Sequence, residues 1–81
     1  MSKTEKLLGK VRKNPKNVSF AELEQLLLAH GFEFRRSRGS HHIYTHGQRA
    51  DIRITVPFKR PHVGEVYVKQ AIDLIEQLSL R

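Results

Sequence analysis

Two stretches of the chain repeat apolar residues at intervals of three and four, the spacing of an amphipathic helix. The first begins at Ser19, which forms a capping-box pattern with Glu22, and ends at Gly31, a residue type that readily takes the left-handed conformation past a helix end. Its apolar positions are Phe20, Leu23, Leu26 and Leu27. The second runs from about Gly64 to Leu78, with Val68, Ala71, Ile72, Ile75 and Leu78. The pattern predicts one helix in each stretch.

Three shorter segments lie between these helices and alternate apolar with polar residues, as strands do. They cover residues 32–37, 41–46 and 52–56. Short glycine-containing links, Arg38-Gly39 and Gly47-Gln48, join them, and Pro57 closes the last one. The sequence therefore predicts an α+β fold: a helix, a three-stranded antiparallel sheet and a second helix, with both helices on one face of the sheet.

The first 17 residues carry an extra basic segment. Leu7, Leu8 and Val11 have helical spacing there, and Asn14-Pro15 ends the pattern, because a residue before proline disfavours helix. A short amphipathic helix and a frayed basic arm fit this segment equally well. We therefore divide the chain into residues 1–17, the basic arm or helix, and residues 18–81, the folded domain.

The amino-acid composition limits the classes of molecule that this protein is expected to bind. Fifteen Lys and Arg against eight Asp and Glu give a formal charge of +7, which favours nucleic acid, an anionic membrane surface or an acidic protein. The chain has no cysteine, so neither disulfides nor thiolate metal sites can stabilise it. No apolar run reaches the length of a membrane span or a signal-peptide core, and we expect a cytoplasmic protein with no membrane partner.

The most informative segment is Gly39-Ser40-His41-His42-Ile43-Tyr44, which places an imidazole among several arginines. Histidine exchanges protons near neutral pH, and guanidinium groups pair with phosphate oxygens. RNA supplies its own nucleophile, the 2′-hydroxyl, so a protein need only remove that proton and stabilise the phosphate. We expect His41 to be the base, with candidate phosphate contacts from Arg35, Arg36, Arg38, Lys59 and, if it is more than a turn residue, Ser40.

Strand alternation separates the neighbouring histidines. It sends His41, Ile43 and Thr45 to one face of the sheet, and it sends His42, Tyr44 and His46 to the other, unless a bulge intervenes. If Tyr44 is the buried residue, His41 faces the open side. If Ile43 is buried, His41 must lie near the sheet edge to reach a substrate. The sequence leaves both arrangements open.

The same residues carry a family resemblance. His30-Gly31-Phe32, Arg35-Arg36, the Gly-Ser-His segment, Thr55-Val56-Pro57 and Tyr67-Val68-Lys69-Gln70 are together similar to the HicA, or YcfA-like, toxins of bacterial toxin–antitoxin pairs. The predicted order of helix, three strands and helix itself resembles the double-stranded-RNA-binding domain. The resemblance to the HicA toxins implies metal-independent cleavage of mRNA without a cofactor, and a HicB-type antitoxin as partner. It also implies that the histidine directly after Gly-Ser, His41, is catalytic. His62 departs from the usual position of a second family histidine.

Other readings remain. A noncatalytic RNA-binding module would use the same sheet and arginines, with His41 only a contact. A metal-bound interaction domain would need ligands from His42, His46, Asp51 and His62, although their spacing matches no recognisable zinc pattern. Lys69 and His62 are the candidates for a second acid or base. Arg49 and Arg53 could extend the phosphate surface, and we expect His30 to interact with the end of the first predicted helix.

Overall fold

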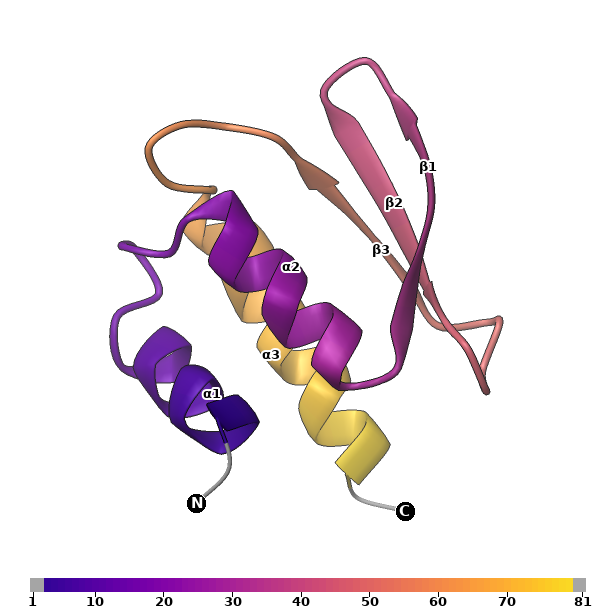
Figure 1. Cartoon of the computed structure of the whole chain (residues 1–81), viewed down its shortest axis with the longest axis horizontal. Helices are drawn as coiled ribbons and strands as arrows, with labels where there is room; N and C mark the ends of the chain where they lie inside the picture. The colour runs from indigo at the N-terminus through magenta and orange to yellow at the C-terminus, as the bar shows by residue number, and fades with distance from the viewer. Residues whose placement is uncertain (1–2, 80–81) are drawn as a thin grey trace.

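A computed structural model describes residues 3–79 of the chain. The elements follow in the order α1 (Lys3–Lys13), α2 (Phe20–Ala29), β1 (Phe32–Arg38), β2 (His41–His46), β3 (Arg53–Pro57) and α3 (Glu65–Ser79) (Figure 1). The strands form an antiparallel sheet in the order β1-β2-β3. The predicted α+β fold, similar to that of double-stranded-RNA-binding domains, is confirmed, and each predicted strand boundary lies within one residue of the observed one.

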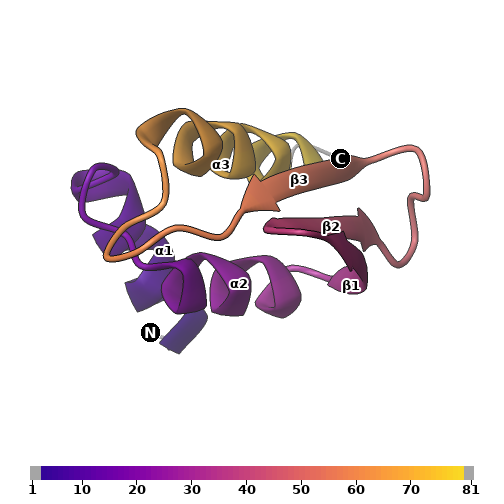
Figure 2. The same cartoon turned by 90° about the horizontal axis from the view of Figure 1, so that it is seen from above.

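Both α2 and α3 lie on one side of the sheet, as predicted (Figures 1 and 2). The core lies between these helices and the sheet. Burial of apolar side chains there removes them from water, which is the main favourable term in folding. Its buried residues are Val11, Val18, Leu23, Leu26, Leu27, Phe32, Tyr44, Ile54, Val56, Val63, Val68, Ala71, Ile72 and Ile75. The other side of the sheet, which α2 and α3 leave uncovered, is called the open face below.

The ends of α2 match the sequence signals. The Ser19 hydroxyl accepts a hydrogen bond from the Glu22 amide at 3.2 Å, and the Glu22 carboxylate accepts one from the Ser19 amide at 3.0 Å. At the other end, Nδ1–H of His30 donates to the Leu26 carbonyl at 2.9 Å, and Gly31 takes a φ of +91°. The predicted capping box, glycine stop and role of His30 are therefore confirmed.

The basic N-terminal segment forms a helix, one of its two predicted alternatives. Val11 of α1 is buried in the core. Lys10 pairs with Glu22 of α2 at 2.5 Å, and Arg12 pairs with Glu76 of α3 at 2.7 Å. Helix α1 thus packs on the helical layer, away from the sheet (Figure 1). Residues 1–2 and 80–81, the outer ends of the two predicted units, lie outside the described residues, and the division at residue 17 stays a prediction.

Candidate catalytic and nucleic-acid-binding face

A two-residue turn places His41 at the start of β2. Arg38 pairs with His41 across the hairpin, so Gly39 and Ser40 alone make the connection. Gly39 has a φ of +60° and Ser40 a negative φ. This combination is typical of a type II′ turn, whose twist matches that of the strands it joins and whose length fixes their register.

Tyr44 determines which way His41 points. Its side chain is fully buried, and its hydroxyl donates to the Glu24 carboxylate of α2 at 2.5 Å. Burial raises the pKa of Tyr44, and the hydrogen bond to Glu24 raises it further, so the phenol stays protonated and remains a donor. Because strand residues alternate, His42 lies on the helix-covered face and His41 on the open face. The second of the two arrangements left by the sequence is thereby excluded.

A β-bulge in β1 brings arginines to the same face as His41. Phe34 pairs with Tyr44, but the next pair joins Arg36 to Ile43, which leaves Arg35 as the extra residue. Residues opposite each other in a sheet point the same way. Without the bulge, Arg36 and Arg38 would follow Phe34 onto the covered face; with it, they join His41 on the open face.

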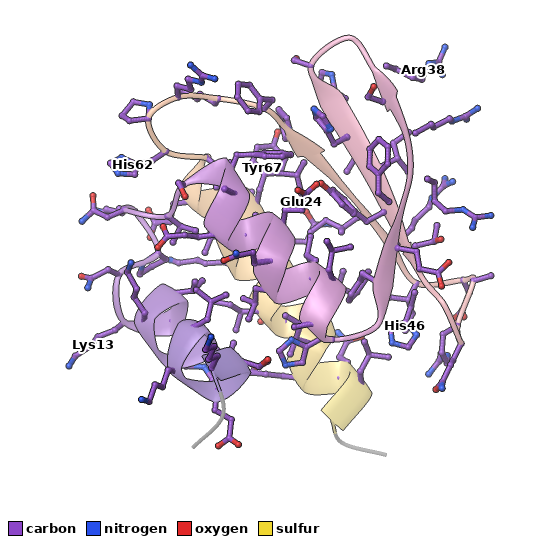
Figure 3. All side chains as sticks on the ribbon, in the orientation of Figure 1. Lys13, Glu24, Arg38, His46, His62 and Tyr67 are labelled. Atoms are coloured by element: carbon purple, nitrogen blue, oxygen red, sulfur yellow. The ribbon has the colours of Figure 1, made fainter. Side chains whose placement is uncertain are left out.

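The open face carries a shallow hollow of about 400 Å³ lined by Arg35, Arg36, Ile43, Thr45 and Arg53. Three arginine side chains therefore line the hollow together with the apolar side chain of Ile43 and the hydroxyl-bearing side chain of Thr45. Arg35 also lies 3.7 Å from the Glu33 carboxylate, a separation that exposed side chains give up readily. The side chain of Arg38 extends outward from the end of the hairpin (Figure 3). The arrangement forms a positively charged surface adjoining one imidazole.

The remaining predicted contacts lie around the same turn. The Ser40 carbonyl accepts a hydrogen bond from the Phe58 amide at 2.6 Å, which joins the turn to the segment after β3. Lys59 follows Phe58 directly and is exposed. Arg49 does not belong to this group, because it lies in the β2–β3 connection at the opposite end of the sheet and pairs with Asp51 at 3.1 Å.

The other histidines have structural settings. Nε2–H of His46 donates to the His30 carbonyl at 3.1 Å, and its Nδ1 accepts from the Gln48 amide at 3.2 Å. This ring therefore joins the end of β2 to the end of α2. The ring of His42 packs against Phe20, with centroids 4.8 Å apart. His62 lies in the β3–α3 loop, well away from the hairpin end in Figure 3.

The metal-site alternative lacks a cluster to support it. Across residues 3–79, no three His, Asp or Glu side chains lie close enough together to hold a metal ion. The second candidate acid or base is also displaced: Lys69 pairs with Glu65 at 3.1 Å on the exposed side of α3. Lys69 therefore belongs to the helical layer and His62 to the β3–α3 loop, whereas His41 lies on the open face. In the same described range, no helix is long and apolar enough to cross a membrane.

Two features of the site escaped the sequence analysis. The bulge at Arg35 left one signal, the run of charged residues that breaks the alternation after Phe34. The other feature is a contact set of aromatic rings that joins the start of α2, β1, β2 and the segment after β3. No local sequence pattern predicts this contact set, because its members are far apart in the sequence.

Comparison with known proteins finds a family match. The sequence model of a family described as the HicA toxin of bacterial toxin–antitoxin systems matches residues 20–80. The match begins at the first residue of α2 and extends through α3, so α1 lies outside it. No curated protein and no solved structure matches the chain.

Proposed function

Since this chain belongs to the HicA toxin family of bacterial toxin–antitoxin systems, we propose that it is an endoribonuclease that cuts mRNA without a metal ion. The observation that supports the proposal most is the shared placement of His41, Arg36 and Arg38 on the open face. A base and two phosphate-binding groups are thereby offered to the same stretch of RNA. Among residues 3–79, all three side chains are exposed.

The reaction needs one proton acceptor near the 2′-hydroxyl. Neutral His41 takes the 2′-hydroxyl proton as the oxygen attacks the adjacent phosphorus. A new P–O2′ bond forms, the P–O5′ bond breaks, and the leaving 5′ oxygen takes a proton from water. The products are a 2′,3′-cyclic phosphate and a 5′-hydroxyl. DNA lacks the nucleophile and is not cut.

The cations have two roles. Arg38, opposite His41, contacts the phosphate that reacts and stabilises the negative charge that builds up on its oxygens. Arg35 and Arg36 bind neighbouring phosphates at the hollow and keep the RNA aligned. Lys59 adds charge from the other side of the turn. Ser40 holds the turn through its backbone, and the proposal gives its hydroxyl no chemical role.

Control by an antitoxin follows from the same surface. A basic open face attracts an acidic protein surface, and electrostatic complementarity speeds association and selects the partner. A cognate HicB-type antitoxin that covers His41 and the arginines would exclude RNA. This mode of inhibition requires no change in the toxin's fold.

One observation favours a second candidate, a noncatalytic RNA-binding module. Among residues 3–79, the ring of His41 has no hydrogen-bond partner that would orient it. In many enzymes, by contrast, a third group holds the catalytic histidine in its working orientation. In that case His41 is only a contact on the same basic face.

Cleavage chemistry separates the two candidates. The protein is incubated in excess EDTA with a defined RNA, and with a DNA of the same sequence that holds one ribonucleotide. The proposal predicts cyclic-phosphate and 5′-hydroxyl ends, with cleavage of the mixed strand only on the 3′ side of its ribonucleotide. Salt-sensitive binding without any cutting would leave the binding module.

A further inference from the structure

Four aromatic rings form a contact cluster at the hairpin end of the sheet, on the helix-covered side. Phe20 lies 4.8 Å from His42 and 5.0 Å from Phe58, measured between ring centroids. Phe34 lies 5.8 Å from His42, which is itself 6.2 Å from Phe58. These separations are typical of tilted aromatic pairs. Phe20, Phe34, His42 and Phe58 are called the aromatic cluster below.

The aromatic cluster is not closed off from solvent. Phe34 keeps 48% of its surface exposed and Phe58 keeps 40%. Phe20 is the first residue of α2, and the β1–β2 hairpin continues past that end of the helix (Figure 1). The outer part of the cluster therefore has no helix over it. The exposed parts of Phe34 and Phe58 therefore leave apolar ring surface available for a ligand.

Cationic residues lie at the exposed part of the aromatic cluster, whereas the Glu24 carboxylate is hydrogen-bonded to buried Tyr44, whose ring lies 5.7 Å from that of Phe34. The Arg60 guanidinium lies 5.4 Å from the centroid of the Phe58 ring. Lys59 is its neighbour in sequence, and Arg38 ends the strand that carries Phe34. From Phe34 to His62 the sequence has one acidic residue, Asp51, which lies in the connection at the other end of the sheet. We therefore expect these rings to bind a flat, apolar group that has negatively charged groups beside it.

The aromatic cluster is joined to His41 through the backbone. The Phe58 amide donates to the Ser40 carbonyl at 2.6 Å, so Phe58 sits beside the turn that precedes His41. His42, at the centre of the cluster, is the next residue along β2. The end of the hairpin thus has an imidazole on its open face and aromatic rings on its covered face.

We propose that the aromatic cluster stacks on an unpaired base of the RNA, next to the nucleotide whose 2′-hydroxyl contacts His41. The inference rests on the proposed function and specifies its substrate as single-stranded RNA. Every base has a π-face that an aromatic side chain can stack on, but the bases of a duplex keep theirs covered. Lys59, Arg60 and Arg38 neutralise the phosphates on either side of the stacked base.

The test uses the protein with His41→Ala, so that RNA stays whole. Its affinity is measured by fluorescence anisotropy for a labelled ten-nucleotide oligoadenylate and for the same ribose-phosphate chain with abasic central positions. Phe34→Leu and Phe58→Leu are added together, and leucine keeps most of the apolar contact. Val66→Ala is the matched control, because Val66 is 72% exposed on α3 and belongs to no part of the site.

Stacking of one base predicts about tenfold tighter binding of the oligoadenylate than of the abasic chain. The paired leucine substitutions should remove that difference and leave the salt dependence unchanged, because no phosphate contact is lost. Val66→Ala should behave as its parent. Unfolding in urea, followed for each variant, checks that the double variant is folded.

Equal affinity for the two oligonucleotides, or full affinity in the folded double variant, would overturn the inference. So would leucine variants that bind RNA normally but bind a cognate antitoxin weakly, since the rings would then form a protein contact. Cleavage by the unmutated protein is measured in parallel. If it cuts while the cluster has no effect, this inference alone fails; if it does not cut, the proposed function fails on its own evidence.

Discussion

Arg38 and His41 form the cross-strand pair next to the β1–β2 turn, and both side chains lie on the open face of the sheet. The turn fixes their register, and the bulge at Arg35 gives Arg38 the orientation that it shares with His41. A guanidinium and an imidazole in neighbouring positions can contact one phosphate group and its adjacent 2′-hydroxyl. The turn and the bulged pairing of β1 with β2 thus place both side chains in the candidate site.

Arg36→Gln and Arg38→Gln should each weaken RNA binding and flatten its salt dependence. Each removes one cation from the open face, and for single strands the slope of log affinity against log salt falls by about 0.7 for each lost phosphate contact. Affinity measured across a salt series checks this. Lys13→Gln is the control, because Lys13 lies on α1, away from the sheet (Figure 3); an equal change in its slope would mean that binding is not localised to the open face.

Gly31→Ala should destabilise the protein more than Gly39→Ala. Both glycines have positive φ, which costs other residues about 1–3 kcal/mol. An added Cβ at Gly31 would also lie 2.7 Å from Nε2 of His46, whereas nothing lies within 4 Å of one at Gly39. His46 cannot move freely, because both ring nitrogens are hydrogen-bonded. Urea unfolding measures the two losses, and equal values would show that the His46 ring yields without cost.

Tyr44→Phe should lower the free energy of unfolding by about 1–3 kcal/mol without changing the cleavage rate of the folded protein. The substitution removes a buried hydroxyl that donates to the Glu24 carboxylate, and hydrogen bonds to charged groups contribute in this range. Tyr44 faces the helices, so the open face is unaffected. Tyr67→Phe, at a half-buried position on α3, is the control. A large loss of cleavage in Tyr44→Phe would place Tyr44 in the site instead.

Glu22→Gln should reduce stability at neutral pH and have no effect in acid. The hydrogen bond from Lys10, followed by that from the Ser19 amide, lowers the pKa of Glu22 below its ordinary value of 4.5. A lowered pKa contributes stability above pH 4.5 that is lost as the pH falls through the folded-state value. Since the Lys10 side chain is 64% exposed, the contribution should be below about 1 kcal/mol. The free energy of unfolding of both proteins is measured from pH 3 to pH 7. A difference between the two proteins that grows towards low pH would refute this prediction.

Local signals made most of the fold predictable. The capping box at Ser19, the stop at Gly31 and the glycine turn at Gly39 each depend on a few neighbouring residues, and the structure has all three. Periodicity located the helices for the same reason. The conformation of the N-terminal segment depends instead on a contact with distant residues, since Val11 of α1 is buried in the core. The sequence alone therefore left a helix and an arm as equal alternatives.

The candidate site was harder to predict because it depends on the relation between strands. The face occupied by His41 followed only once Tyr44 was found buried, since alternation alone allows either face. The bulge at Arg35 is a property of the β1–β2 pairing and not of either strand alone. Arg49 was grouped with the other arginines by proximity in sequence, but it pairs with Asp51 at the far end of the sheet.

The most direct test of the account compares two histidines. Single-turnover cleavage of a defined RNA in EDTA is measured for the unmutated protein, His41→Ala and His62→Ala, with RNA binding measured beside it. If His41 is the base, His41→Ala loses cleavage but keeps binding, while His62→Ala, in the β3–α3 loop away from the open face, cuts within about twofold of the parent. Cleavage by His41→Ala at the unmutated rate would contradict it.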